Sequence, residues 1–242
     1  MRRFVVVFIT SDRFATLADS FFEYLLKYGQ LIGSTQTYIP TWVDTIKSSI
    51  SHLLTKAGQT QADETYLSDY NGQVIPQFSH LGCFAPGNWI LGGKLLGSDG
   101  VFQYGLALAA GCINTYTSSV TGIGPESFVF KTTSGGTNQV TIDDPAFYEK
   151  NGFNYGSVDY VLRPEVLESV FYAYRTTGDS HWQDLAWAAF NNIQKYCKAP
   201  AALAGIVAVN DTQTQQYDDS ESFLYAGEKI DKSLSKISAR VH

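Results

Sequence analysis

Cysteine and histidine are scarce in this sequence, which has three cysteines and four histidines among 242 residues. Three cysteines allow at most one internal disulfide. There is no Cys-x-x-Cys pair and the histidines are scattered, so little in the sequence indicates a zinc-type centre. Basic residues are also fewer than acidic ones, which gives a formal net charge of -6. The chain therefore lacks the electrostatic footprint of a nucleic-acid-binding protein and the basic patch of a membrane-surface protein.

The N-terminus carries a short apolar run after Arg2 and Arg3, and this run is far too short to span a bilayer. It has the length of the shortest signal-peptide cores, but no small-x-small cleavage site follows it. Three interpretations of residues 1–10 stay open: a degraded signal peptide, a strand, or a wrongly assigned start. Glycine and proline are too few for a disordered or fibrous class.

Aromatic side chains, by contrast, are abundant: 15 Tyr, 15 Phe and 4 Trp within an ordinary hydrophobic fraction of 44%. Such a content suits a large core, and it also suits sites that stack sugar rings on flat apolar faces. The length allows one large domain or two small ones.

The hydrophobic pattern is mostly helical. Apolar residues at helical spacing predict helices over 19–32, 38–56, 86–96, 101–118, 164–174 and 181–196. An Asn-Gly pair at 71–72 predicts a β-hairpin, and a short strand is expected at 204–209. The connection 121–160 is long enough to indicate a functional loop or one that carries a small hairpin. Helix pairs that follow one another with hairpins between them are typical of an α/α toroid.

The stretch Tyr160–Ser169 is the most informative local motif. It places Glu165 and Glu168 three positions apart at a proline-initiated helix start, directly after Arg163. The free N–H groups and the dipole of the first turn stabilise negative charge there. An ionised carboxylate beside a guanidinium suits a general base held against a polar substrate. A capped surface helix with acidic residues in its first turn is the alternative, and the local pattern alone favours it.

Three further segments accompany this motif: Ala18-Asp19-Ser20-Phe21-Phe22-Glu23, His80-Leu81-Gly82-Cys83-Phe84 and Ser220-Glu221-Ser222-Phe223. Together with Leu162-Arg163-Pro164-Glu165, in this order, they resemble glycoside hydrolase family 47, the class I α-1,2-mannosidases of the fungal and Golgi type. The resemblance runs from about residue 14 to about residue 226.

For the fold, the resemblance implies a mainly α chain that forms part of an α/α toroid, about half of a seven-helix-pair barrel, with short β-hairpins in the connections. It divides the chain into an uncertain segment 1–13, a partial barrel 14–226 and a non-matching polar tail 227–242. We expect a fragment, or a gene model whose reading frame breaks near Gly227.

For catalysis, the resemblance implies inverting hydrolysis of terminal α-1,2-linked mannose, with Glu165 as the base and Asp19 as a second catalytic carboxylate. The family's acid lies in an upstream helix that this sequence does not contain, so impaired activity is expected. Arg163 is expected to grip the terminal mannose, with a salt bridge to Glu165 or Glu168 as the alternative. His80 and Phe84 are expected in the floor of the site. Taken alone, a histidine such as His80 is more often a satisfied core residue.

Leu17 also bears on the substrate by resemblance. An apolar residue two positions before Asp19 is found in relatives that trim several mannoses, whereas arginine there is found in relatives that remove one. Leu17 therefore indicates broader trimming.

The resemblance also implies one Ca²⁺, held largely through water by carboxylates that include Glu168 and Glu221, with Glu23 as a further candidate. The threonine that contacts the ion in the family belongs to an Asn-Thr-Glu-Ala motif that this sequence lacks. A plain capping role beside Ser220 is the alternative for Glu221.

The same resemblance pairs Cys83 with Cys112 in a disulfide. Cys197 lies late in a helical pattern, so we expect it to be buried and free.

The expected partner is the high-mannose N-glycan of a glycoprotein, with no nucleic acid and no stable protein partner. The expected location is the secretory pathway, either in the Golgi membrane system or secreted. A non-catalytic glycan-binding module or an inert fragment is the alternative function.

Overall fold

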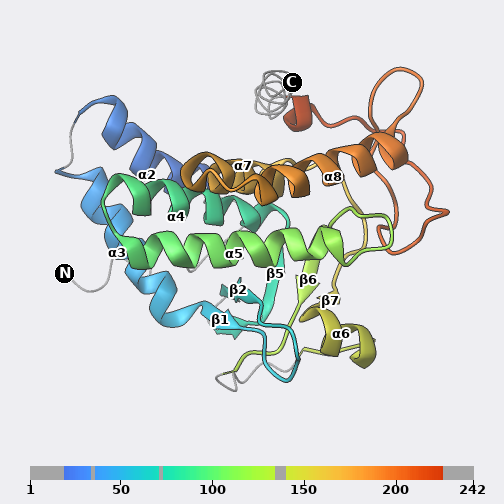
Figure 1. The fold of residues 1–242 in the computed structure, drawn as a ribbon, viewed down its shortest axis with the longest axis horizontal. Helices are drawn as coiled ribbons and strands as arrows, with labels where there is room; N and C mark the ends of the chain where they lie inside the picture. The colour runs from blue at the N-terminus through green and yellow to red at the C-terminus, as the bar shows by residue number, and fades with distance from the viewer. Residues whose placement is uncertain (1–18, 34–35, 71–72, 134–139, 226–242) are drawn as a thin grey trace.

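The computed structural model describes residues 19–33, 36–70, 73–133 and 140–225 (Figure 1). The expected boundaries at 1–13 and 227–242 lie outside these residues, as do Leu17 and the Asn71-Gly72 pair. The described helices are α2 (Asp19–Leu31), α3 (Tyr38–His52), the 3₁₀ helix η1 (Leu81–Cys83), α4 (Phe84–Leu95), α5 (Asp99–Thr117), α6 (Pro145–Asn151), α7 (Glu165–Thr177) and α8 (Ser180–Cys197). Residues 222–225 are helical as well.

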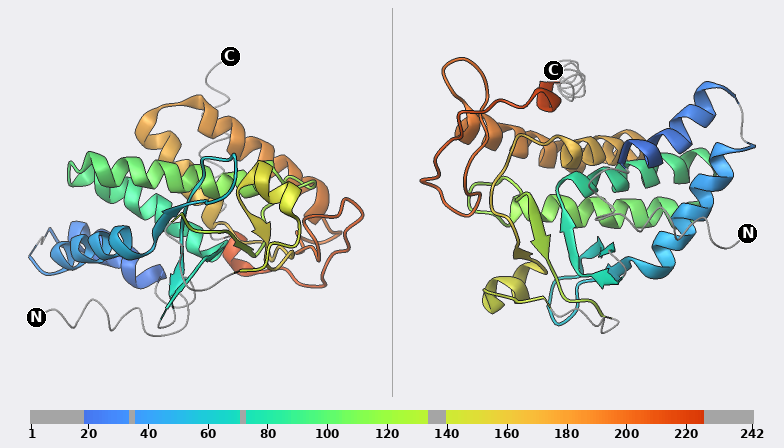
Figure 2. Two further views of the ribbon diagram at one scale, coloured as in Figure 1. Left: turned by 90° about the horizontal axis from the view of Figure 1, so that it is seen from below. Right: turned by 180° about the vertical axis from the view of Figure 1, so that it is seen from behind.

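The long helices pack against one another in pairs. Helix α4 packs against both α5 and α7, α7 packs against α8, and α2 packs against α3 (Figures 1 and 2). The turn between α7 and α8 follows from the local sequence, because Gly178 ends α7 with φ 73° and the carboxylate of Asp179 accepts from the N–H of His181 at the start of α8. The mainly α fold of paired helices is confirmed.

The strands are short and antiparallel, and they lie on one side of the long helices (Figure 1). They are β1 (Leu54–Lys56), β2 (Thr65–Leu67), β3 (Asp69–Tyr70), β4 (Val74–Ile75), β5 (Gln77–Ser79), β6 (Ser127–Val129) and β7 (Asn154–Tyr155). Three sheets result, with strand orders β1-β2, β3-β4 and β5-β6-β7. The β3–β4 pairing confirms the predicted hairpin. Within 121–160, β6 and β7 pair antiparallel, but helix α6 lies in the connection between them, so they do not form a small hairpin.

Two expected elements are wrong. The helix expected to reach Lys56 ends at His52, because Leu54, Thr55 and Lys56 pair with β2 instead. Residues 204–209 do not form a strand. Only Ile206 bridges, to Tyr160 on one side and Gln216 on the other, and such isolated bridges do not make a ladder.

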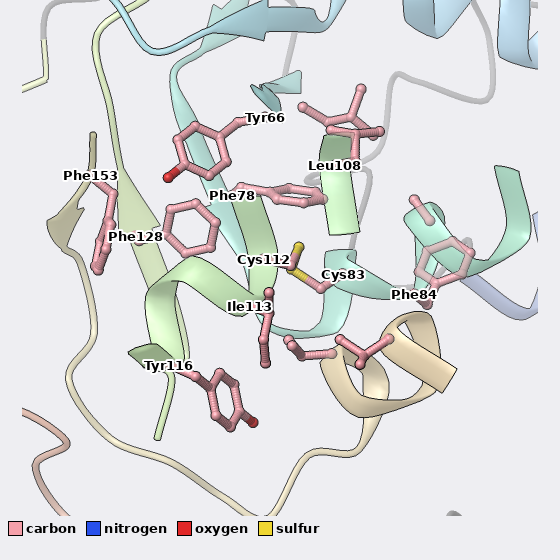
Figure 3. Packing of buried hydrophobic residues seen from close by; sticks show 14 of the residues in the cluster. Tyr66, Phe78, Cys83, Phe84, Leu108, Cys112, Ile113, Tyr116, Phe128 and Phe153 are labelled. Atoms are coloured by element: carbon pink, nitrogen blue, oxygen red, sulfur yellow. A yellow bond between two sulfur atoms is a disulfide. The ribbon is translucent and has the colours of Figure 1, made fainter. Parts of the chain in front are cut away.

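A continuous aromatic core joins the helices to the sheets. The ring of Tyr66 lies 5.1 Å from that of Phe128, and Phe78 and Phe153 pack on the same Phe128 ring at 5.9 and 5.8 Å (Figure 3). All four side chains are at most 1% exposed. Edge-to-face pairs at these distances contribute beyond their buried area, roughly 0.5–1.5 kcal/mol each.

The disulfide prediction is confirmed. Cys83 and Cys112 are bonded with their Cα atoms 6.1 Å apart, and the bridge joins the start of α4 to the middle of α5 (Figure 3). Cys197 is buried and free, and burial raises the pKa of its thiol to about 12. Within the part of the chain that the structure describes, no helix is long and apolar enough to cross a membrane.

Candidate active site

The candidate site is built around the start of α7. Glu165 is the first residue of this helix and Pro164 is its N-cap, so the proline lies one position earlier than the sequence suggested. Glu165 and Glu168 both lie in the first turn, as expected. The backbone N–H of Glu168 donates to the carbonyl of Pro164 at 2.9 Å, which closes that turn.

The residue that leads into this helix has an unusual backbone conformation. Leu162 is fully buried and has φ 64°, in the left-handed region that side chains other than glycine rarely adopt. Its neighbours hold it there: the main chain of Tyr160 exchanges two hydrogen bonds with Ile206, and the Tyr160 hydroxyl donates to the carbonyl of Arg163 at 3.1 Å. Strain of this kind persists only where the surroundings impose it, and it clusters at functional sites. Here it sets the direction in which Arg163 leaves the backbone.

Glu165 and His80 are brought together. The Nδ1 atom of His80 lies 3.0 Å from Oε2 of Glu165, and its Nε2 atom lies 2.7 Å from the hydroxyl of Tyr116. The side chain of His80 is 1% exposed and that of Glu165 is 13% exposed. Glu165 thus has one oxygen turned to a buried histidine, and the carboxylate retains a small exposed surface.

Arg163 does not make its salt bridge to Glu165 or Glu168. Its Nε atom donates to both carboxylate oxygens of Glu126, at 2.8 and 2.7 Å. Burial alone would lower the pKa of the guanidinium, but the hydrogen bond and charge of Glu126, with the charges of Glu165 and Glu221, raise it. The Phe223 ring lies 5.6 Å from the guanidinium carbon, so the last helical segment also reaches this site.

Glu126 is a site residue that sequence reasoning missed. It lies in a loop just before β6, and its carbonyl accepts from the backbone N–H of His80 at 2.9 Å. A sequence signal existed in Gly124-Pro125-Glu126, a carboxylate placed by a rigid turn within a connection already suspected of function.

Glu168 lies in a second group of charges, which includes Glu23 and Lys27 of α2. Lys27 of α2 bonds to Glu23 one turn before it, and its Nζ atom lies 4.0 Å from Oε1 of Glu168. Burial, and next the charge of Glu23, raise the pKa of Glu168 to about 7, although Lys27 acts in the opposite direction. The Tyr172 ring lies 5.6 Å from Lys27 Nζ. Glu23 and Lys27 thus bring α2 to the site.

Phe84 begins α4, where it is 8% exposed and belongs to the core. Beside it, the hydroxyl of Ser169 donates to the carbonyl of Cys83 and accepts from the N–H of Gly87 at 2.9 Å. These bonds fasten α7 to the start of α4. Asp19 is the first residue of α2, and its side chain lies outside the described part of the structure.

The carboxylates do not form a direct metal site. Among the described residues, no group of three or more His, Cys, Asp or Glu side chains is placed to hold an ion. Glu168 is already next to Lys27, and Glu126 is taken by Arg163. The described carboxylates therefore do not make a direct ligand set for Ca²⁺, and they fit the ion only as a shell that holds its waters.

The long helices follow one another in pairs, and carboxylates, an arginine and a histidine gather near the helix starts. This arrangement places the chain in the α/α-barrel class. The chain belongs to glycosyl hydrolase family 47, whose family model matches residues 8–228. The structure is similar to an α-1,2-mannosidase from Trichoderma reesei, with a TM-score of 0.85 and 38% sequence identity. The match covers 92% of this chain and 47% of that one.

Curated relatives agree with this membership. The probable mannosyl-oligosaccharide alpha-1,2-mannosidase 1B of Neosartorya fischeri is 42% identical over 212 residues, covering 86% of this chain and 42% of the relative. The mannosyl-oligosaccharide alpha-1,2-mannosidase 1B of Emericella nidulans is 41% identical over 213 residues, covering 86% and 41%. The chain thus spans less than half the length of these relatives.

Proposed function

We propose that the protein hydrolyses terminal α-1,2-linked mannose of high-mannose N-glycans, with inversion at the anomeric carbon. The observation that carries the proposal is the carboxylate of Glu165, held by His80 at 3.0 Å beside the Arg163–Glu126 pair. The names of the relatives that are 41–42% identical support this bond and substrate class.

Glu165 is proposed as the general base. Its Oε2 atom faces His80, so Oε1 is the oxygen left for a water molecule. As the water oxygen attacks the anomeric carbon, its proton passes to Glu165 and the bond from that carbon to the glycosidic oxygen breaks. An acid supplies the proton that the leaving oxygen needs. Inverting enzymes hold the two carboxyl groups about 6.5–9.5 Å apart, which leaves room for the water.

Asp19 is proposed as the second carboxylate, acting near the leaving oxygen or through water. Its place at the start of α2 supports this role, because Glu23 and Lys27 of the same helix reach the charges around Glu168.

Arg163 is proposed to bind the terminal mannose. Its Nε atom is occupied by Glu126, and within the described ranges Nη1 and Nη2 make no hydrogen bond to protein. Two parallel donors on a fixed plane suit a pair of vicinal hydroxyls. His80 and Phe84 are proposed to support the floor of the site, below Glu165 and at the start of α4 respectively. Leu17, as an apolar residue, is proposed to permit trimming of several mannoses.

Calcium is proposed as the cofactor, with Glu168 and Glu221 holding waters of the ion. The support is the family membership and the nearness of several carboxylates to the first turn of α7. When bound, the ion would supply positive charge among these carboxylates.

The secretory pathway, Golgi or secreted, is the proposed location. A disulfide between Cys83 and Cys112 supports it, because disulfides persist in oxidising compartments.

The test is mannose release from a high-mannose N-glycan in the presence of Ca²⁺, followed by proton NMR. Release of β-mannose before mutarotation, and no release from a glycan stripped of α-1,2-linked mannose, would support the proposal. Initial release of α-mannose would contradict inversion. Glycan binding with no release would favour a mannose-binding module instead.

A further inference from the structure

Tyr116 is a buried residue that the mechanism above does not use. It lies in the last turn of α5, is 1% exposed, and places its hydroxyl 2.7 Å from Nε2 of His80. Glu165, His80 and Tyr116 therefore form one chain of polar contacts that leads from the site into the core. The three residues come from α7, from the residue before η1 and from α5.

The chemistry of this chain fixes the direction of each hydrogen bond. An ionised carboxylate only accepts, so Nδ1 of His80 must carry the proton that faces Glu165. In the neutral imidazole, Nε2 is then a bare acceptor, and the group that faces it must donate. The Tyr116 hydroxyl is that group, because burial keeps its pKa well above the usual range and the oxygen stays protonated.

The packing around Tyr116 holds the hydroxyl against His80. Cys112 lies one helical turn before Tyr116 and is bonded to Cys83, whose own N–H donates to the carbonyl of His80 at 3.0 Å. The disulfide thus links the two segments that carry His80 and Tyr116.

We propose that Tyr116 is a positioning residue: its hydroxyl donates to Nε2 of His80 and holds the imidazole with Nδ1–H toward Glu165, which keeps this carboxylate turned toward the attacking water. The inference rests on the proposed role of Glu165 as base. Without the hydroxyl, the buried Nε2 atom of His80 loses its donor and the imidazole ring is no longer held in place. The hydrogen bond from Nδ1–H to Oε2 of Glu165 then weakens. Tyr116 itself is too deeply buried to touch a sugar.

The experiment measures the tautomer of His80 by ¹⁵N–¹H NMR, with the signal assigned from a His80→Gln variant. The native chain should show the Nδ1–H form. Tyr116→Phe, which keeps the ring and removes the oxygen, should weaken the hydrogen bond from Nδ1–H to Glu165 and move the Nδ1 proton signal upfield. Tyr155→Phe is the matched control, because it removes a hydroxyl that bonds Ser119 instead, 3.2 Å away. An Nε2–H form in the native chain would overturn the inference even if Tyr116→Phe fails to fold.

Kinetics then separate this inference from the proposed function. Mannose release by Tyr116→Phe should fall on the order of 10-fold in kcat with little change in KM. This is below the roughly 10²–10⁴-fold contribution of a general base, because the base itself remains. An unchanged Nδ1 proton signal and rate in Tyr116→Phe, with release still dependent on Glu165, would overturn the inference and leave the proposed function standing. A shifted Nδ1 proton signal in a chain that releases no mannose would support the positioning role and count against the proposed function.

Discussion

Arg163 donates from Nε to both carboxylate oxygens of Glu126, a residue 37 positions earlier in the chain. The contact joins the loop before β6 to the entry of α7, and both groups are only about one-fifth exposed. It holds the guanidinium plane in place while leaving its terminal N–H groups for a ligand. The pair is therefore the part of the proposed mannose site that determines where a sugar hydroxyl can bind.

Glu126→Gln should weaken glycan binding, because a neutral amide cannot accept from Arg163 as a carboxylate does. Hydrogen bonds to charged groups are worth about 1.5–3 kcal/mol, so a loss of roughly 10- to 100-fold in affinity is expected. Titration calorimetry with a high-mannose glycan measures it. Glu149→Gln, at an exposed acid that bonds Gln61, is the control and should bind normally. If Glu126→Gln binds the glycan with unchanged affinity, the proposed role of Arg163 in binding mannose is wrong.

Loss of the Cys83–Cys112 bridge should destabilise the chain by on the order of 3–4 kcal/mol, given its sequence separation of 29. Urea unfolding of the Cys83→Ser/Cys112→Ser double variant gives the value. A reducing agent should lower the stability of the native chain and leave that of the double variant unchanged. A reductant effect of equal size in both would mean that the bridge is not the source of the stability.

Stability should depend on pH through Glu168, whose pKa is raised from 4.5 to about 7 by burial. The folded state then holds a proton that the unfolded state releases, so the free energy of unfolding falls as the pH rises from about 4.5 to about 7. Chelator should be present so that no Ca²⁺ contributes. Glu168→Gln should remove this part of the slope, up to about 3 kcal/mol in total. Urea unfolding at several pH values tests it, and identical slopes in the two proteins would contradict the shift.

Calcium should bind this chain weakly, with a dissociation constant on the order of 10⁻⁴–10⁻³ M, because the described carboxylates offer no direct ligand set. Glu168→Gln and Glu221→Gln should each weaken binding further, as measured by calorimetry. Glu149→Gln again serves as the control. Tight Ca²⁺ binding that neither substitution weakens would mean that the ion binds away from Glu168 and Glu221.

The sequence predicted most of the helices and part of the site for physical reasons that are local. Helices α2, α7 and α8 have strong 3.6-residue periodicity, so their existence could be predicted without knowledge of distant residues. The helix predicted over Leu54–Lys56 is wrong for a non-local reason. These residues pair with β2, and only the folded chain brings the two strands together.

Within the site, the same distinction holds. Glu165 and Glu168 share a helical turn, so their placement could be read from their spacing. The two partners of His80 lie 36 and 85 positions away along the chain and the partner of Arg163 lies 37 away, so no local pattern predicts these contacts. The positive φ of Leu162 is equally hidden, because leucine carries no preference for that conformation.

The most direct test of the account is the effect of Glu165→Gln on mannose release, measured beside glycan binding by the same protein. The amide keeps the shape of the side chain but cannot take a proton from water. The account predicts that release falls by about 10²–10⁴-fold or becomes undetectable, while binding through Arg163 stays within a few-fold of the native chain. Release that survives the substitution, or binding that is lost together with release, would contradict it.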